Sequence, residues 1–262
     1  MNARSPSQSP RERIAGAISE ANARGRPALV AFLTAGHPSR AQFREHLQSI
    51  ASGADVVEIG VPFTDPMADG ATIQRSSRAA LAQGVTLRWI LGELEAMPRV
   101  PAPLLLMSYL NPLLAFGFDA LADAAARAGV CGFIVPDLPF DEASELRRAL
   151  DARALALVQM VTPVTAKERM REVCASSQGF VYAVTMTGTT GREVAVPPDV
   201  VAYLDGVRTL SPVPVCAGFG IRSREQIERL RGHVDGVIVG SALVEVLERG
   251  DDPAAWLRRL RA

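Results

Sequence analysis

The chain has 262 residues, 48% of them hydrophobic, and its 28 basic and 28 acidic side chains balance to a formal net charge of zero. This length suits one domain with a large core. The even charge, without a long block of one sign, argues against nucleic acid or an anionic membrane as a partner, and no apolar run approaches a membrane span. We therefore expect a small-molecule or protein partner.

The first ten residues are polar and proline-bearing, and we expect residues 1–10 to form a disordered tail before a single domain at 11–262. Residues 11–24 space apolar side chains at helical intervals, which predicts a helix across the bottom of that domain. Cys131, Cys174 and Cys216 are odd in number and lie in or beside apolar segments, so we expect reduced thiols in a cytoplasmic protein.

Strand and helix patterns alternate along the rest of the chain. Short apolar runs predict strands over residues 28–35, 55–63, 104–110, 132–136, 155–161, 180–186, 213–217 and 236–239. The segments between them have helical spacing, with Ser39 expected to cap the first helix, and Asn111 and Pro112 expected to end the third strand. Eight such units predict an α/β fold, a single-domain (β/α)8 TIM barrel with an extra N-terminal helix, whose function lies at the carboxyl ends of the strands.

The second predicted strand and the loop after it carry two candidate catalytic carboxylates. Strand parity puts Val57 and Ile59 on one face and Glu58 on the other, beside Gly60. Burial should raise the pKa of Glu58, which suits a group that both gives and takes a proton, although a structural ion pair is the alternative. Asp69 lies in the turn-rich loop that follows, and two carboxylates in different settings can hold different protonation states.

Glycine turns follow the seventh and eighth strands, at Gly218 and Gly220 and at Gly240 and Ser241. Such turns can serve the chain reversal alone. At these two positions of a barrel, however, backbone N–H groups at helix starts commonly bind phosphate. The pattern favours a phosphorylated small-molecule substrate.

Several reaction types lack the residues they need. The single lysine, Lys167, begins a helix and should face solvent, which argues against a Schiff-base mechanism. His37, His46 and His233 are dispersed without metal-ligand spacing, so we expect no metal site. Acid–base chemistry by carboxylates, with help from Tyr182, is what remains.

Residues 58–74 read EIGVPFTDPMADGATIQ, which resembles the signature LEIGxPFSDPxADGPxIQ of the tryptophan synthase alpha subunit family almost position by position. The similarity continues with AFLTAGHP at 31–38, MSYLNP at 107–112, GFIVPDLP at 132–139, TGTTG at 187–191, GFGI at 218–221 and GSALV at 240–244. The resemblance implies a lyase of tryptophan biosynthesis that needs no cofactor in this chain. Its reaction is the retro-aldol cleavage of indole-3-glycerol phosphate to indole and glyceraldehyde 3-phosphate.

The resemblance also implies roles for individual residues. Glu58 protonates C3 of the indole and then assists removal of the side-chain hydroxyl proton, Asp69 holds the indole N–H, and Tyr182 lines the site near Glu58. Phe32 packs on the indole, and Thr190 orients Asp69 when the loop at 187–194 closes. The phosphate contacts implied by the family are Gly191, Phe219, Gly220, Gly240 and Ser241.

A protein partner is implied as well. In the family this subunit docks on a beta subunit that contains pyridoxal phosphate and takes the indole through a tunnel, in an alpha2beta2 tetramer. The corresponding contact segments here are residues 62–66 and 111–114, with Pro62, Asp65, Pro66 and Asn111 as candidates. Asp65 is the candidate coupling residue rather than a catalytic one.

Some positions depart from the family pattern. His37 stands where aspartate is common, Phe140 where proline is frequent and Phe180 where another tyrosine often lies, and Thr189 changes GVTG to TGTTG. These departures should affect partner contacts and loop kinetics rather than the reaction.

Two alternative functions remain. A non-enzymatic allosteric partner on the same barrel would require loss of Glu58 or Asp69, and both are present. Another phosphate-binding barrel, such as indole-glycerol-phosphate synthase or a sugar-phosphate isomerase or aldolase, is the second. The synthase and the lysine-dependent aldolases should carry catalytic lysines at strand ends, and one lysine in the whole chain argues against them.

Overall fold

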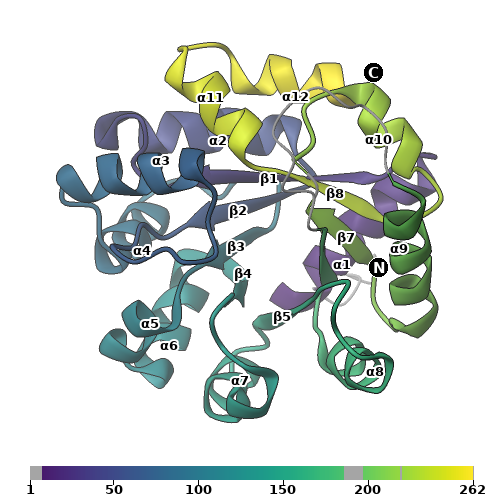
Figure 1. The fold of residues 1–262 in the computed structure, drawn as a ribbon. Coiled ribbons are helices and arrows are strands. Elements are labelled where there is room, and N and C mark those ends of the chain that lie inside the picture. The colour runs from purple at the N-terminus through teal and green to yellow at the C-terminus, as the bar shows by residue number, and fades with distance from the viewer. Residues whose placement is uncertain (1–7, 186–196, 219, 262) are drawn as a thin grey trace, which may run out of the picture.

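Eight parallel strands close into a barrel in sequence order, from β1 to β8 (Figure 1). The computed structural model describes residues 8–185, 197–218 and 220–261. The strands are β1 Ala28–Thr34, β2 Val56–Gly60, β3 Leu104–Met107, β4 Val130–Ile134, β5 Ala156–Val161, β6 Val181–Val184, β7 Val215–Gly218 and β8 Gly236–Val239. The predicted (β/α)8 barrel is therefore confirmed.

Helices surround the strands in Figure 1 and fill the segments between them. They are α1 Pro10–Ala23, α2 Phe43–Gly53, α3 Ala71–Ala82, α4 Leu87–Ala96, α5 Leu110–Phe116, α6 Phe118–Ala128, α7 Ser144–Asp151, α8 Lys167–Ser176, α9 Pro198–Leu210, α10 Arg224–Leu230, α11 Ser241–Glu248 and α12 Pro253–Arg261. Short 3-10 turns precede α2 and α7, as η1 Arg40–Gln42 and η2 Phe140–Glu142. In the described part of the chain, no helix has the length and apolar character that crossing a membrane requires.

Helix α1 is the extra N-terminal helix. Its Ile14 and Ile18 are fully buried and belong to the core inside the barrel, together with Phe180, so this helix closes the barrel interior as predicted. The helix begins at Pro10, and Glu12 accepts hydrogen bonds from the backbone N–H of Ser9 at 2.7 Å and from its hydroxyl at 2.8 Å. The remainder of the expected tail, residues 1–7, lies outside the described residues.

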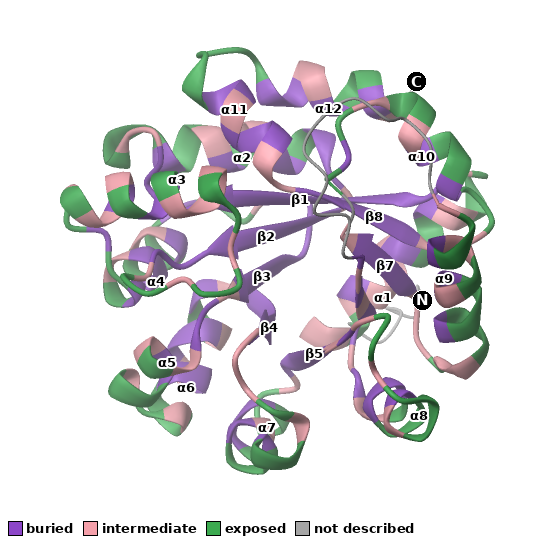
Figure 2. Cartoon of the chain, viewed as in Figure 1, coloured by how far each residue is buried: buried purple, intermediate pink, exposed green. Residues whose placement is uncertain are grey.

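The core has two layers, which follow from strand parity. Val57 and Ile59 pack in the layer between strands and helices, whereas Val56 lies in the layer inside the barrel. Figure 2 shows the strands mostly buried and the exposed residues gathered on the outer faces of the helices and in the loops. Glu58 shares the inward face with Val56, so the parity prediction is confirmed.

Two local predictions were wrong. The third strand ends at Met107, not Leu110, and Asn111 and Pro112 lie in the first turn of helix α5. Proline is tolerated there because first-turn N–H groups have no partner within the helix, and the N–H of Leu110 instead donates to Asp137 at 2.8 Å. Ser39 makes no capping hydrogen bond through its side chain. It precedes the 3-10 turn η1, and helix α2 begins only after that turn, at Phe43.

Candidate active site

A cavity of about 510 Å³ lies at the carboxyl ends of the strands. Its lining includes eight of the residues predicted from the sequence, Phe32, Glu58, Asp69, Tyr182, Gly218, Gly220, Gly240 and Ser241. The other lining residues, which sequence reasoning did not single out for this site, are Ala68, Gly70, Ile73, Met107, Pro136, Met160, Thr162, Val184 and Ile238. The barrel thus brings together both candidate carboxylates and the candidate phosphate turns.

Glu58 occupies a dry position in this cavity wall. Its side chain is 0% exposed, and neither carboxyl oxygen has a hydrogen-bond partner among the described residues. Desolvation by burial raises the pKa of Glu58 from 4.5 to about 8, so the carboxyl is largely protonated at neutral pH. The ion-pair alternative finds no support here, and a protonated carboxyl next to a cavity can donate a proton.

Asp69 lies in a loop that several side chains hold in place. The Tyr109 hydroxyl accepts a hydrogen bond from the N–H of Ala68 at 2.9 Å, and Gln74 donates to the backbone oxygen of Asp69 at 2.8 Å. Burial raises the pKa of Asp69 to about 6, against a smaller lowering effect of hydrogen bonding with Tyr109. Asp69 is therefore mostly ionised at neutral pH while Glu58 is mostly protonated.

The same loop is anchored at its start. Ser77 of α3 accepts from the N–H of Phe63 at 2.8 Å and donates to its carbonyl oxygen at 3.1 Å, and the Phe63 ring stacks on Tyr109 with centroids 5.1 Å apart. These positioning contacts were not predicted, because they join residues 14 and more positions apart. Tyr109 lies within the MSYLNP segment at 107–112, and the family similarity of that segment was the one available signal.

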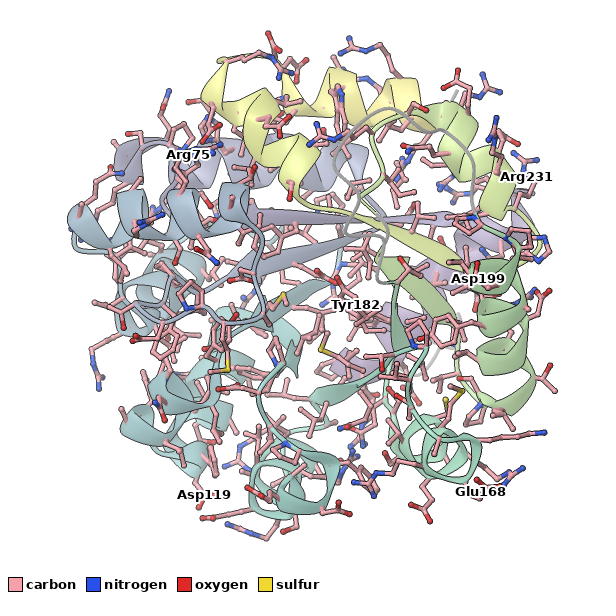
Figure 3. The ribbon with its side chains drawn as sticks, viewed as in Figure 1. Arg75, Asp119, Glu168, Tyr182, Asp199 and Arg231 are labelled. Atoms are coloured by element: carbon pink, nitrogen blue, oxygen red, sulfur yellow. The ribbon has the colours of Figure 1, made fainter. Side chains whose placement is uncertain are left out.

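The two aromatic rings of the site need glycine neighbours. A Cβ added at Gly60 would lie 2.5 Å from the Phe32 ring, and one at Gly218 would lie 2.7 Å from Tyr182. Phe32 and Glu58 are register partners across β1 and β2, which places the aromatic ring beside the acid. Tyr182 lies in the middle of the ring of helices in Figure 3, and burial, followed by the charges of Glu58 and Asp69, raises its pKa well above 10.0.

The candidate phosphate end of the cavity is formed by β7, β8 and α11. Ser241 is the first residue of α11 and Gly240 precedes it, so first-turn N–H groups lie at the cavity wall. Gly220 has φ +63°, a conformation that suits glycine. The other predicted substrate contacts, Thr190, Gly191 and Phe219, lie outside the described residues, as does the whole loop at 187–194.

The predicted partner contacts lie on the loop after β2 and on helix α5 after β3. Asp65 and Asn111 are exposed, Pro66 is half-buried, and Pro62 is buried and lines a small cavity beside the active site. Two large apolar side chains in the same segments face solvent, Met67 on the loop at 83% exposure and Leu114 in α5 at 52%.

The lysine, the histidine at position 37 and the three cysteines lie outside the active-site cavity. Lys167 is exposed at the start of α8, as predicted. His37 is buried and its Nε2 lies 3.2 Å from Glu248, and burial lowers its pKa. Cys131, Cys174 and Cys216 are buried and free. No cluster of three His, Cys, Asp or Glu side chains arranged to hold a metal is present within residues 8–185, 197–218 and 220–261.

Comparison with known proteins agrees with this geometry. Residues 18–262 match the family model of the tryptophan synthase alpha chain. The tryptophan synthase alpha chains of Nitratidesulfovibrio vulgaris Hildenborough and Geobacter sulfurreducens are 46% and 43% identical to this chain, over 94% and 95% of it and over 96% and 97% of the relatives.

Solved structures agree as well. A tryptophan synthase structure from M. tuberculosis superposes with a TM-score of 0.86 at 34% identity, covering 95% of this chain and 96% of the other. The tryptophan synthase alpha subunit from Legionella pneumophila gives 0.83 at 32% identity, with 95% of each chain covered. The chain belongs to the tryptophan synthase alpha chain family.

Proposed function

We propose that this chain catalyses the lyase reaction of its family, the cleavage of indole-3-glycerol phosphate to indole and glyceraldehyde 3-phosphate, with Glu58 and Asp69 as its acid–base pair. The observation that carries the proposal is Glu58, a fully buried carboxyl in the wall of a 510 Å³ cavity that has no hydrogen-bond partner among the described residues. A stabilising role gives no reason for such a group, since an unpaired buried carboxyl costs folding free energy. A role in proton transfer explains why the buried carboxyl is there.

Each carboxylate has a distinct task in the reaction. Protonated Glu58 gives its proton to C3 of the indole ring, and the resulting carboxylate accepts the proton of the side-chain hydroxyl. As the hydroxyl becomes an aldehyde, the bond between the ring and the side chain breaks, and its electron pair returns to the ring to form indole. Asp69, ionised at neutral pH, accepts a hydrogen bond from the indole N–H and stabilises the positive charge that protonation creates there.

Substrate orientation follows from the two ends of the cavity. The phosphate binds at Gly240 and Ser241, where α11 begins, and at Gly220 after β7, and the indole packs on Phe32. Tyr182 closes the wall between them. Gly191 and Phe219 as phosphate contacts, and Thr190 as the residue that orients Asp69 when residues 187–194 close, are carried by the family resemblance alone.

A beta subunit is the partner that the family implies. Its docking surface on this chain comprises Pro62, Asp65, Pro66 and Asn111, in an alpha2beta2 tetramer whose pyridoxal phosphate belongs to the beta subunit. Met67, which follows Pro66 and is 83% exposed, would add apolar area to this surface. Three free, buried thiols support a cytoplasmic location.

The test is indole release from indole-3-glycerol phosphate by the purified chain, with and without the beta subunit, for the wild type, Glu58→Gln and Asp69→Asn. Glu58→Gln should reduce indole release by at least about a hundredfold, the usual lower size of a general acid–base contribution, while a non-cleavable phosphate analogue still binds. A fully active Glu58→Gln variant, or an inactive wild type with its partner present, would overturn the proposal.

A further inference from the structure

Asp137, in the GFIVPDLP segment after β4, has no role in the reaction proposed above. Strands β3 and β4 are neighbours in the barrel (Figure 1), with Met107 opposite Ile134. Leu110 and Asp137, each three residues further along, therefore leave the barrel at the same level. The N–H of Leu110 donates to the carboxylate of Asp137 at 2.8 Å, and Asp137 forms no salt bridge with another described residue. The contact of this half-buried carboxylate is thus with the start of helix α5.

The peptide group between Tyr109 and Leu110 is held at both of its polar atoms. Its N–H, which has no partner within α5 because it lies in the first turn, donates to Asp137. Its carbonyl oxygen accepts a hydrogen bond from the hydroxyl of Ser108 at 2.9 Å. Ser108 is buried, and its own N–H donates to the carbonyl oxygen of Ile134 at 3.1 Å. Rotation of this peptide would break two hydrogen bonds, so the direction in which the Tyr109 side chain leaves the backbone is fixed.

The Tyr109 side chain extends from that fixed backbone to the loop of Asp69. Its hydroxyl accepts a hydrogen bond from the N–H of Ala68 at 2.9 Å and is also hydrogen-bonded with the carboxylate of Asp69. Burial raises the pKa of Tyr109 to about 12, so the hydroxyl keeps its proton at neutral pH and can donate it to that carboxylate. A small rotation at the backbone would move the hydroxyl, at the far end of a rigid ring, away from Asp69.

We propose that Asp137 is a positioning residue for the reaction: by holding the peptide that follows Tyr109, it keeps the Tyr109 hydroxyl on the carboxylate of Asp69. The proposal rests on the catalytic role proposed above for Asp69. The link from Asp137 to Asp69, however, is measurable without the reaction. If Asp137 only stabilises helix α5, its loss will lower the stability of the chain and leave Asp69 unchanged.

A ¹³C NMR titration of the aspartate side-chain carboxyl groups in the full chain measures the link, with the Asp69 signal assigned by its loss in Asp69→Asn. Asp69 faces Tyr109 and shares the active-site cavity with Glu58 and Tyr182. In the wild type it should titrate near pH 6. Hydrogen bonding with Tyr109 lowers the pKa of Asp69, so Asp137→Ala should raise the midpoint by about 0.5 to 1 pH unit, the size of one ordinary hydrogen bond.

The sign of the shift is decisive. Loss of the negative charge of Asp137 would by itself lower the pKa of Asp69, because a nearby like charge raises the pKa of a carboxyl. A higher midpoint in Asp137→Ala therefore reports the displaced Tyr109 hydroxyl, and an unchanged or lower midpoint overturns the proposal. Asp119→Ala, at an exposed aspartate in the first turn of α6 (Figure 3), is the matched control and should titrate as the wild type does.

Three further variants test the route. Asp137→Asn keeps an acceptor oxygen for the N–H of Leu110, so its midpoint should stay at or below that of the wild type. Ser108→Ala removes the other hold on the same peptide and should raise the midpoint, which keeps the proposal testable if Asp137→Ala folds poorly. The double variant Tyr109→Phe/Asp137→Ala should titrate no higher than Tyr109→Phe alone, since both changes act through one hydroxyl. Additive shifts in the double variant, or an unshifted Ser108→Ala, would overturn this route.

Indole release by the same proteins separates this proposal from the proposed function. Asp137→Ala should lower kcat by about tenfold or less with little change in KM, and it should move the acid limb of the pH profile to higher pH as Tyr109→Phe does. A variant that unfolds more easily but keeps the wild-type kcat and acid limb would show a structural role alone and overturn the proposal. If the wild type releases no indole while the Asp69 titration shifts as expected, the proposed function fails and the positioning role of Asp137 stands.

Discussion

Replacing Glu58 by glutamine should stabilise the folded chain, and the stabilisation should grow with pH. The folded state keeps a proton on this fully buried carboxyl up to about pH 8, whereas the unfolded chain loses it near pH 4.5. The free energy of unfolding of the wild type therefore falls as the pH rises from 4.5 to about 8. At about 1.4 kcal/mol for each pH unit of that window, the loss is on the order of 5 kcal/mol.

Glutamine cannot ionise, so Glu58→Gln removes this loss. Urea unfolding of both proteins at about pH 5 and pH 9 measures it: the variant should gain several kcal/mol relative to wild type at the higher pH and little at the lower one. Glu168→Gln, at an exposed position on the outer surface (Figure 3), should change the free energy of unfolding by about 0.5 kcal/mol or less at either pH. An effect of Glu58→Gln that does not vary with pH would refute a raised pKa for this carboxyl.

Three further predictions concern activity. The kcat/KM of the isolated chain should be bell-shaped, falling below pH about 6 as Asp69 becomes protonated and above pH about 8 as Glu58 loses its proton. Gly218→Ala should lower kcat/KM by roughly a hundredfold, because the new Cβ would lie 2.7 Å from Tyr182 and must displace that ring. Tyr109→Phe removes a hydroxyl that lowers the pKa of Asp69, so the acid limb of the profile should move to higher pH, and kcat/KM should fall about tenfold.

Each of these activity predictions has a control or a contrary result. A pH profile that stays flat between about pH 5 and pH 9 would contradict the assignment of the two carboxylates. Gly206→Ala in α9, where a Cβ meets nothing within 4 Å, should leave activity unchanged. If Gly218→Ala also leaves kcat/KM unchanged, the position of the Tyr182 ring is not important for catalysis. An acid limb unmoved in Tyr109→Phe would show that this hydroxyl does not act on Asp69.

The barrel and its inward carboxyl could be predicted from local pattern. Strand parity alone placed Glu58 on the face of Val56 and opposite Val57, and the structure confirms that face. The glycine after Glu58 has a reason that parity could not give, since Gly60 leaves room for the ring of Phe32 on the neighbouring strand. Alternation of short apolar runs with helical segments was sufficient for the fold because each unit is local in sequence.

The features that were missed depend on contacts across the chain. The sequence predicts that Pro112 ends a strand, but Pro112 lies in the first turn of α5. The N–H of Leu110 at the start of that helix donates to Asp137, which is 27 residues away in the sequence. The hydrogen bond from the N–H of Ala68, next to Asp69, to the Tyr109 hydroxyl joins residues 41 positions apart.

The proposed reaction requires Glu58 to be a protonated acid at neutral pH. A ¹³C NMR titration of the glutamate side-chain carboxyl groups in the isolated chain, with the Glu58 signal assigned by its loss in Glu58→Gln, tests this requirement. We expect a carboxyl that titrates near pH 8. A Glu58 signal that titrates near 4.5 would mean that the carboxyl is ionised at neutral pH and cannot supply the proton, so the proposed role of Glu58 would be wrong.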